Sequence, residues 1–413
     1  MHILLKILPA PSIETVARRA TRHLIRRGVA ANTISYDSDE NTLVIGDRQR
    51  LFLANAHAQC VRAWPWQRGR VLRRFLDSLL DTPEEVGLEE AAPRLLPGVR
   101  HIGWFDAASS RALPPEATPQ DFSKPILRLG EYLAASVFLD SPQSTRVVAE
   151  KDAERWGLSW QEIFEKAKAN LASRSRQPLC RLADGVYVSE WHDYYDSARL
   201  LLDEVLRDVE IEGNPVALVP TWNQLLVTGD GNPSALGAAL SVAEKAAEHE
   251  GRPACLVPLV RREGAWRTLD LPVGHPCEPE LRRLRVLDLI GPYAEQKRLL
   301  DRRHESEGLD VFVASFTGVR DKDGGDTRSY CAWTKGVLAL LPKTDEVMFG
   351  DLDQPKGQQM LGRFSWAVVW HACHELMTPT EHLLPRFRVD AFPTEDQFAA
   401  MRANQGTRDR ASG

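Results

Sequence analysis

Residues 216–231 read VALVPTWNQLLVTGDG, and this stretch decides the fold class. Its two apolar runs, VALV and LLVT, flank a polar turn, which predicts a pair of short strands. The glycines that follow turn the chain into an alanine-rich helix over 233–250, and further strands are expected at 254–260 and 265–271. This order predicts a mixed α/β fold of the α+β type, with amphipathic helices flanking mixed sheets.

The residues before this stretch carry helix and strand signals. Ser159 stands three residues before Glu162, a capping box that opens a helix with a regular apolar face. A strand at 186–188 and a helix over 196–209 are expected next.

The first 80 residues are expected to form two amphipathic helices, over 12–27 and 69–80, with a hairpin at 33–45. Residues 1–12 are interpreted as an opening strand, because a lysine and two prolines interrupt the apolar run. Prolines and acidic residues dominate 81–124, which predicts loops.

The last third of the chain is expected to be rich in strands. A long helix over 278–305, kinked or broken at Gly291-Pro292, leads into it, and the tail from residue 401 should fray. The strands are expected at 310–316, 330–333, 337–341, 347–349 and 365–370.

A chain of 413 residues should form two or three domains. The predicted parts are a basic N-terminal module (1–80), a Pro-rich connection (81–124), a central α/β module (125–276), a C-terminal β-rich module (277–400) and a flexible tail (401–413).

The composition, 43% hydrophobic and 26% charged, is that of a globular protein. The longest apolar runs are far shorter than the roughly 20 residues of a spanning helix, so no membrane contact is expected. Six cysteines without CxxC pairs fit a reducing compartment, which predicts a cytoplasmic protein with free thiols.

Three segments resemble, in order and spacing, the YtpQ-like family of uncharacterised bacterial proteins. They are TRVVAEKDAERWGLSWQEIFEKAKANL (145–171), YYDSARLLL (194–202) and VALVPTWNQLLVTGDG. The resemblance covers about residues 125–275, is weaker over 1–80 and is absent after 277. It implies an α/β fold and a cytoplasmic bacterial protein, with no particular activity. The family pattern has a charged residue where this chain has TWNQ, so any role of that charge is missing here.

Four residues are the candidates for binding a ligand. Asp196 at a helix start can cap free amides, and Arg199 can pair with it. Tyr195 and Trp222 add aromatic surface. A structural cap, an ion pair and core packing explain the same residues without a ligand, and no catalytic set stands out.

Metal and thiol chemistry have weak sequence support. His371, Cys373 and His374 lie close together but lack the HExxH spacing, so neither a metal nor a cofactor is expected. Cys331 would need a nearby base to act as a nucleophile, and a buried structural thiol is the preferred interpretation. The loop at 321–326 is interpreted as a solvated turn rather than a calcium site.

The charge is uneven along the chain. Residues 1–75 carry 13 Lys or Arg against 5 Asp or Glu, a net charge of +8, which leaves −13 for the remainder. Arginines in this part are candidates for binding nucleic-acid phosphates, although a solvated helix face or docking onto the acidic remainder explains them equally. They are Arg18, Arg19, Arg22, Arg26, Arg27, Arg70, Arg73 and Arg74.

These observations favour a non-catalytic binding or regulatory protein whose partner is another protein, for example in a defence or toxin-neutralising context. The alternatives are a hydrolase-like enzyme with residues gathered from distant positions, and nucleic-acid binding through the basic module. A further hypothesis is an internal duplication, in which 217–271 and 339–389 form related units, because ALVPTWNQLLVTGD and ALLPKTDEVMFGD share one pattern.

Overall fold

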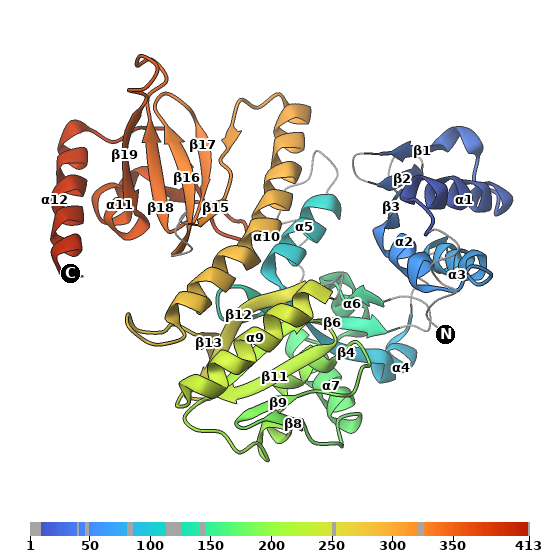
Figure 1. Cartoon of the computed structure of the whole chain (residues 1–413). Helices are drawn as coiled ribbons and strands as arrows, with labels where there is room; N and C mark the ends of the chain where they lie inside the picture. The colour runs from blue at the N-terminus through green and yellow to red at the C-terminus, as the bar shows by residue number, and fades with distance from the viewer. Residues whose placement is uncertain are drawn as a thin grey trace. The chain divides into compact units, whose positions relative to one another are not determined.

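The computed structural model divides the chain into two compact units, residues 1–95 with 138–147 and residues 96–137 with 148–413. The expected α+β class is confirmed (Figure 1). The structure describes residues 10–38, 41–45, 49–80, 86–112, 125–140, 145–249, 253–320 and 326–411. Most of the opening strand expected at 1–12, and most of the turn expected at 321–326, lie outside these ranges.

The first unit packs three helices on a small antiparallel sheet. The helices are α1 (Ile13–Arg26), α2 (Leu53–Arg62) and α3 (Arg68–Leu80), and the sheet has the order β1 (Ile34–Asp37), β2 (Thr42–Ile45), β3 (Gln49–Phe52). The Thr15 amide donates to Ser12 Oγ at 3.3 Å and so caps α1. The predicted helices and hairpin are therefore confirmed, whereas α2 and β3 were not predicted. The core contains Val16, Ala20, Leu24, Leu43, Leu53, Leu72 and Leu76.

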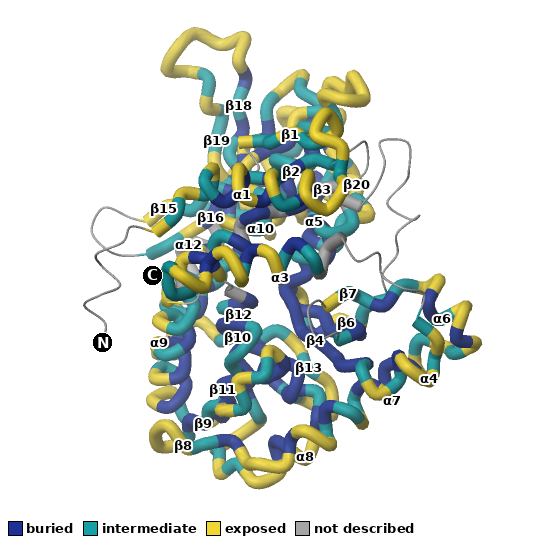
Figure 2. The backbone as a smooth tube through the Cα atoms, turned by 90° about the vertical axis from the view of Figure 1, so that its right-hand side faces the viewer, coloured by how far each residue is buried: buried dark blue, intermediate teal, exposed yellow. Residues whose placement is uncertain are grey.

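Loops were expected over 81–124, and this expectation is wrong for the part of the segment that the structure describes. It holds α4 (Leu88–Ala91), β4 (Leu95–His101) and α5 (Ile102–Ala112). Every residue of β4 is buried, as the dark tube in Figure 2 shows. Pro97 and Gly98 looked like turn residues, but burial of the apolar residues around them outweighs their low strand propensity.

The second unit contains a six-stranded sheet. Its order is β13 (Ala265–Thr268), β12 (Pro253–Arg262), β10 (Pro215–Thr221), β11 (Gln224–Gly229), β9 (Val186–Val188), β8 (Cys180–Ala183). Helix α9 (Pro233–His249) packs on this sheet through Leu236, Ala239, Leu240 and Ala243. The strands and helix predicted from 216–271 are confirmed, as is the capped helix α7 (Trp160–Ser173). The helix expected at 196–209 is instead a 3-10 helix, η5 (Asp196–Leu201), followed by the short α8 (Asp203–Leu206).

A hairpin precedes this sheet. Strand β6 (Leu133–Asp140) lies between β4 and β5 (Leu127–Leu129), and β7 (Thr145–Val147) pairs with β6 before α6 (Glu150–Trp156) begins. The long helix α10 (Glu278–Glu307) runs 30 residues and continues through Pro292, so of the expected kink or break at Gly291-Pro292 the break is wrong and the kink stays a prediction.

Two four-stranded sheets follow α10 (Figure 1). One has the order β14 (Phe312–Val313), β17 (Ala339–Pro342), β21 (Arg386–Val389), β20 (Thr378–Pro379). The other has the order β15 (Thr317–Arg320), β16 (Thr327–Thr334), β18 (Glu346–Gly350), β19 (Met360–Ser365).

Three expectations for this part are wrong. Residues expected as a strand at 365–370 form helix α11 (Trp366–Cys373), because a short apolar run is compatible with either element. Helix α12 (Glu395–Ala411) continues through the expected flexible tail. The expected internal duplication of 217–271 and 339–389 is wrong. In the first segment β10 pairs with β11, whereas the corresponding strands β17 and β18 lie in different sheets.

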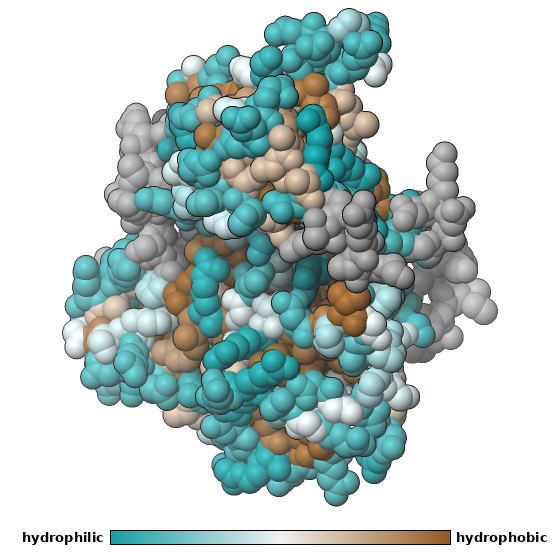
Figure 3. All heavy atoms as spheres, turned by 90° about the vertical axis from the view of Figure 1, so that its left-hand side faces the viewer, coloured by the Kyte–Doolittle hydropathy of each residue, from teal (hydrophilic) through white to brown (hydrophobic). Residues whose placement is uncertain are grey.

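None of the described helices combines the length and apolar character needed to span a bilayer. Figure 3 shows one face of the molecule, on which apolar side chains lie in patches among hydrophilic ones, as is usual for a folded protein surface.

Candidate functional sites

The eight candidate arginines of the first unit are all exposed, and together they are called the basic surface: Arg18, Arg19, Arg22, Arg26, Arg27, Arg70, Arg73 and Arg74. The side chains of five make neither a hydrogen bond nor an ion pair with the described residues: Arg19, Arg26, Arg70, Arg73 and Arg74.

One bridge joins the two helices that carry this surface. His23 Nε2 of α1 lies 2.8 Å from Asp77 Oδ1 of α3, and Arg27 Nε lies 3.3 Å from the same oxygen. Residues three or four apart share a helix face, so Arg19 and Arg26 flank His23 on α1. By the same spacing, Arg73 and Arg74 lie one turn before Asp77 on α3. The arginines of both helices therefore adjoin a single carboxylate.

An aromatic pair lies next to this surface in sequence. Trp64 and Trp66, in the turn between α2 and α3, stack with ring centroids 5.0 Å apart and an interplanar angle of 17°. Trp66 is 74% exposed, which is unusual for so large an apolar side chain. The segment WPWQRGR was the available signal for this pair, and the sequence analysis missed it.

Three of the four predicted binding residues are buried: Tyr195, Asp196 and Arg199. The Asp196 carboxylate accepts the Trp191 amide at 3.1 Å and the Asp193 amide at 3.2 Å. These contacts hold a loop in which His192 and Tyr194 have φ of 53° and 69°. Asp196 therefore stabilises a strained loop, and its role in binding stays a prediction.

The expected ion pair between Asp196 and Arg199 is wrong. Arg199 donates from both terminal nitrogens to Asp193, each at 2.8 Å, and its Nε donates to Ser175 Oγ at 2.8 Å. Burial opposes ionisation of Asp193, but the hydrogen bonds and charge of Arg199 keep its pKa lowered. The Asp196 carboxylate is turned toward the loop amides, which leaves Asp193 as the partner.

The Trp222 carbonyl accepts from the Ser197 amide at 3.4 Å, next to Asp196, whereas its ring packs on other residues. Arg100 Cζ is 3.7 Å from the centroid of the Trp222 ring, and Trp104 meets the same ring edge-on. The backbone of Trp222 therefore adjoins the Asp196 segment, while its ring contacts Arg100 and Trp104.

The thiol and histidine candidates are also dispersed. His371 and His374 are exposed on and just after α11, whereas Cys373 is buried in the core, so these neighbours in sequence do not share one environment. Cys331 is 1% exposed, as expected, and its thiol accepts from Thr344 Oγ1 at 3.4 Å. Burial raises the pKa of Cys331 to about 12.

A buried polar cluster that the sequence analysis missed joins β4, β12 and α10. Cys255 Sγ donates to Asp288 Oδ2 at 3.2 Å, and His101 Nε2 lies 3.6 Å from the same oxygen. The Leu256 amide donates to Asp288 Oδ1 at 2.8 Å. Burial raises the pKa of Asp288 and of Cys255 and lowers that of His101. The three residues come from distant segments without a shared motif, so no sequence signal pointed to them.

Among the residues that the structure describes, these three side chains could hold a metal, since their ligand atoms lie within 4.8 Å of one another. The hydrogen bonds argue against it. The Gly103 amide donates to His101 Nδ1 at 3.0 Å, so the proton of a neutral imidazole sits on Nε2, the nitrogen that faces Asp288. Cys255 and Asp288 are hydrogen-bonded to each other, whereas His101 Nε2 is buried at 3.6 Å from Asp288 without a hydrogen-bond partner among the described residues.

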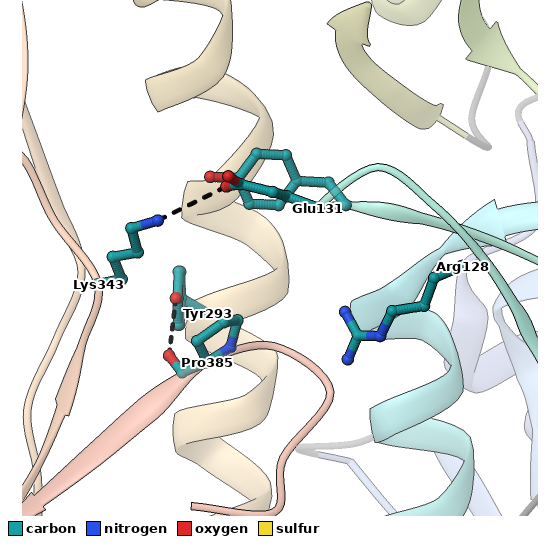
Figure 4. Close-up of a pocket in the computed structure, with 6 residues that line it drawn as sticks. Arg128, Glu131, Tyr293, Lys343 and Pro385 are labelled. Atoms are coloured by element: carbon teal, nitrogen blue, oxygen red, sulfur yellow. Dashed lines mark hydrogen bonds and ion pairs between the residues drawn. The ribbon is translucent and has the colours of Figure 1, made fainter. Parts of the chain in front are cut away.

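A cavity of about 240 Å³ lies beside α10 (Figure 4). Arg128 and Lys343 approach it from opposite sides, and Lys343 Nζ lies 3.7 Å from Glu131 Oε2. The cavity is lined by Arg128, Glu131, Tyr132, Tyr293, Lys343 and Pro385, and we call it the α10 pocket.

Each of the two tyrosines of the α10 pocket packs against another aromatic ring. Tyr132 is parallel to His101, with centroids 6.3 Å apart and planes at 5°, and Tyr293 stacks on Phe316 at 5.0 Å and 9°. The Tyr293 hydroxyl donates to the Pro385 carbonyl at 2.9 Å. The apolar part of the pocket is therefore preformed.

A buried arginine fixes α10 to the C-terminal sheet below this pocket. Arg386 is fully buried and donates to Gln296 Oε1 at 2.6 Å and to the carbonyls of Ala314 and Leu340 at 2.8 and 2.9 Å. Burial lowers the pKa of Arg386 to about 10. Gln296 in turn donates to Asp106 of α5 at 2.7 Å.

Comparisons with known proteins find no matching family model, no matching curated protein and no matching solved structure.

Proposed function

We propose that this chain is a non-catalytic nucleic-acid-binding protein that holds a phosphate backbone on its basic surface. The observation that carries the proposal is the set of five exposed arginines on α1 and α3 whose side chains make neither a hydrogen bond nor an ion pair with the described residues. Phosphates are suitable counterions for such a surface, because a guanidinium can donate two parallel N–H groups to phosphate oxygens. The net charge of +8 on residues 1–75 adds long-range attraction.

The aromatic pair favours a single strand as the bound form. Bases of a single strand are free to stack on an exposed ring, whereas bases of a duplex are stacked on one another. Trp66 offers such a ring, and Trp64 supports it from one side. Arg70 follows four residues later in the first turn of α3 and adds a positive charge close to this ring in sequence.

The chemistry of the thiols supports a non-catalytic role. All six cysteines are free, and the pKa of each is raised, in five cases chiefly by burial and in Cys180 by its hydrogen bond to Glu190. A raised pKa keeps the thiol protonated at neutral pH and therefore poorly nucleophilic.

Salt titration tests this proposal. Fluorescence anisotropy with a labelled oligonucleotide of roughly 12 nucleotides should give a dissociation constant that rises steeply between about 50 and 200 mM salt. A single strand should bind more tightly than a duplex of the same length. Trp66→Ala should remove most of that difference, and Trp66→Phe should keep part of it, because a smaller aromatic ring still stacks. Equal binding of both forms, unaffected by Trp66→Ala, would contradict the single-strand assignment.

A protein partner in a defence or toxin-neutralising context stays a prediction. Docking of the basic surface onto the acidic remainder of the chain is the competing explanation for its charge. That explanation requires no nucleic acid, and it predicts no salt-sensitive anisotropy change at all.

A further inference from the structure

We propose that the α10 pocket binds a small organic anion, consisting of a carboxylate or phosphate group on a flat apolar body. This inference is independent of the nucleic-acid proposal, since the pocket belongs wholly to the second unit.

The charge of the lining residues selects an anion. Arg128 and Lys343 contribute two positive charges, against one negative charge from Glu131. Lys343 and Glu131 are 3.7 Å apart and about half exposed, so each only partly neutralises the other. Arg128 donates to the neutral carbonyl of Leu383 at 3.3 Å, which leaves the charge of its guanidinium uncompensated by that contact. An anionic group with one negative charge, bound between the two cations, would bring the net charge of the pocket to zero.

The remaining lining selects a flat apolar body. Tyr132 and Tyr293 are 8% and 1% exposed, and the partly buried Pro385 adds a third apolar ring to the lining. The Tyr293 hydroxyl is already occupied by the Pro385 carbonyl, so this ring offers mainly apolar surface. Because His101 and Phe316 hold both rings in place, a ligand would bind without first ordering them.

The size of the cavity limits the ligand. Ligand pockets commonly measure about 300–1,000 Å³, so a volume of about 240 Å³ admits a small molecule rather than a dinucleotide. None of the six lining residues is a cysteine, serine, threonine or histidine, Lys343 is paired with Glu131, and the Tyr293 hydroxyl is bonded to the Pro385 carbonyl. Binding, as of an effector, is the chemistry that this lining supports.

Calorimetric titration of the full chain with three probes tests the inference. Benzoate and phenyl phosphate carry the two anionic groups, and benzamide is the neutral isostere of benzoate. Benzoate or phenyl phosphate should bind at least tenfold more tightly than benzamide. If only one anion binds, the result assigns the headgroup to a carboxylate or to a phosphate, and either supports the inference.

The variants Arg128→Gln and Lys343→Gln should each weaken binding of the anions at least fivefold and leave benzamide unchanged. Lys356→Gln removes one exposed cation that does not line the pocket and is the matched control. Thermal unfolding checks that each variant is folded, and the two variants test the same prediction independently. Equal affinity for benzoate and benzamide, no effect of either variant, or no heat with any probe up to about 10 mM would overturn the inference.

Discussion

Arg199 and Asp193 form a bidentate ion pair, with both terminal nitrogens of the arginine 2.8 Å from the two carboxylate oxygens. The arginine is fully buried, whereas the Asp193 side chain is 32% exposed. A buried charge of this kind depends on its partner, because removing one member leaves the other unpaired in a medium of low polarity.

Asp193→Asn should therefore destabilise the protein by about 2–3 kcal/mol at neutral pH. The pKa of Asp193 is lowered in the folded state, so its contribution is fully present above the usual carboxylate range and is lost as the pH falls through its folded pKa. Chemical denaturation at several pH values should show the difference between wild type and variant shrinking toward acid pH. Asp184→Asn, which alters a 92% exposed carboxylate, is the control and should cost less than about 0.5 kcal/mol.

Arg386→Met should cost about 3–5 kcal/mol, since it removes the donors to Gln296, Ala314 and Leu340 from a fully buried position. Arg388→Met makes the same change two residues along β21, where the side chain is exposed, and should have little effect. Urea unfolding of the two variants measures this difference in stability. Equal stability of both would mean that Arg386 does not fix α10 to the sheet.

Asp77→Asn should tighten binding of a single-stranded oligonucleotide about two- to threefold at low salt, because it removes the carboxylate that adjoins the basic surface. The asparagine can still accept from His23, so the loss of stability should stay below about 1 kcal/mol. Anisotropy and thermal unfolding measure the two effects separately. Unchanged or weaker binding by a folded variant would count against the proposed location of the phosphates.

Cys331 should resist alkylation by iodoacetamide at mildly alkaline pH in the folded protein, because it is buried and its pKa is raised to about 12. Mass spectrometry after labelling should find this thiol unmodified, and all six thiols modified after denaturation. Rapid modification of Cys331 in the folded state would restore it as a candidate nucleophile.

The sequence was sufficient where a local signal coincides with the final packing. Ser159 and Glu162 cap α7, and the alternation around residues 216–231 predicts the β10–β11 pair, because both signals act within one element. The sequence was insufficient where burial in the folded protein determines the secondary structure of a segment. Pro97 and Gly98 resemble turn residues yet lie in the fully buried β4.

The candidate sites show the same division. The exposure of the basic surface follows from helical spacing, so Arg18, Arg22 and Arg26 could be predicted on one face. The cluster of Cys255, His101 and Asp288 unites three elements that are distant in sequence, and no spacing rule predicts such a contact. The α10 pocket is likewise formed by separate segments, which only the folded chain brings together.

The central claim is that the basic surface binds nucleic-acid phosphates, and a comparison of two charge-matched variants tests it most directly. One variant changes Arg19, Arg26, Arg73 and Arg74 to glutamine, and the other changes exposed Arg181, Arg267, Lys356 and Arg388 in the second unit. Both lose four positive charges, so only the location of the loss differs. Anisotropy with a single-stranded oligonucleotide should show at least a tenfold weaker affinity and a shallower salt dependence for the first variant, and a near wild-type curve for the second. Equal weakening by both variants, or no binding by the wild-type protein at low salt, would contradict the account.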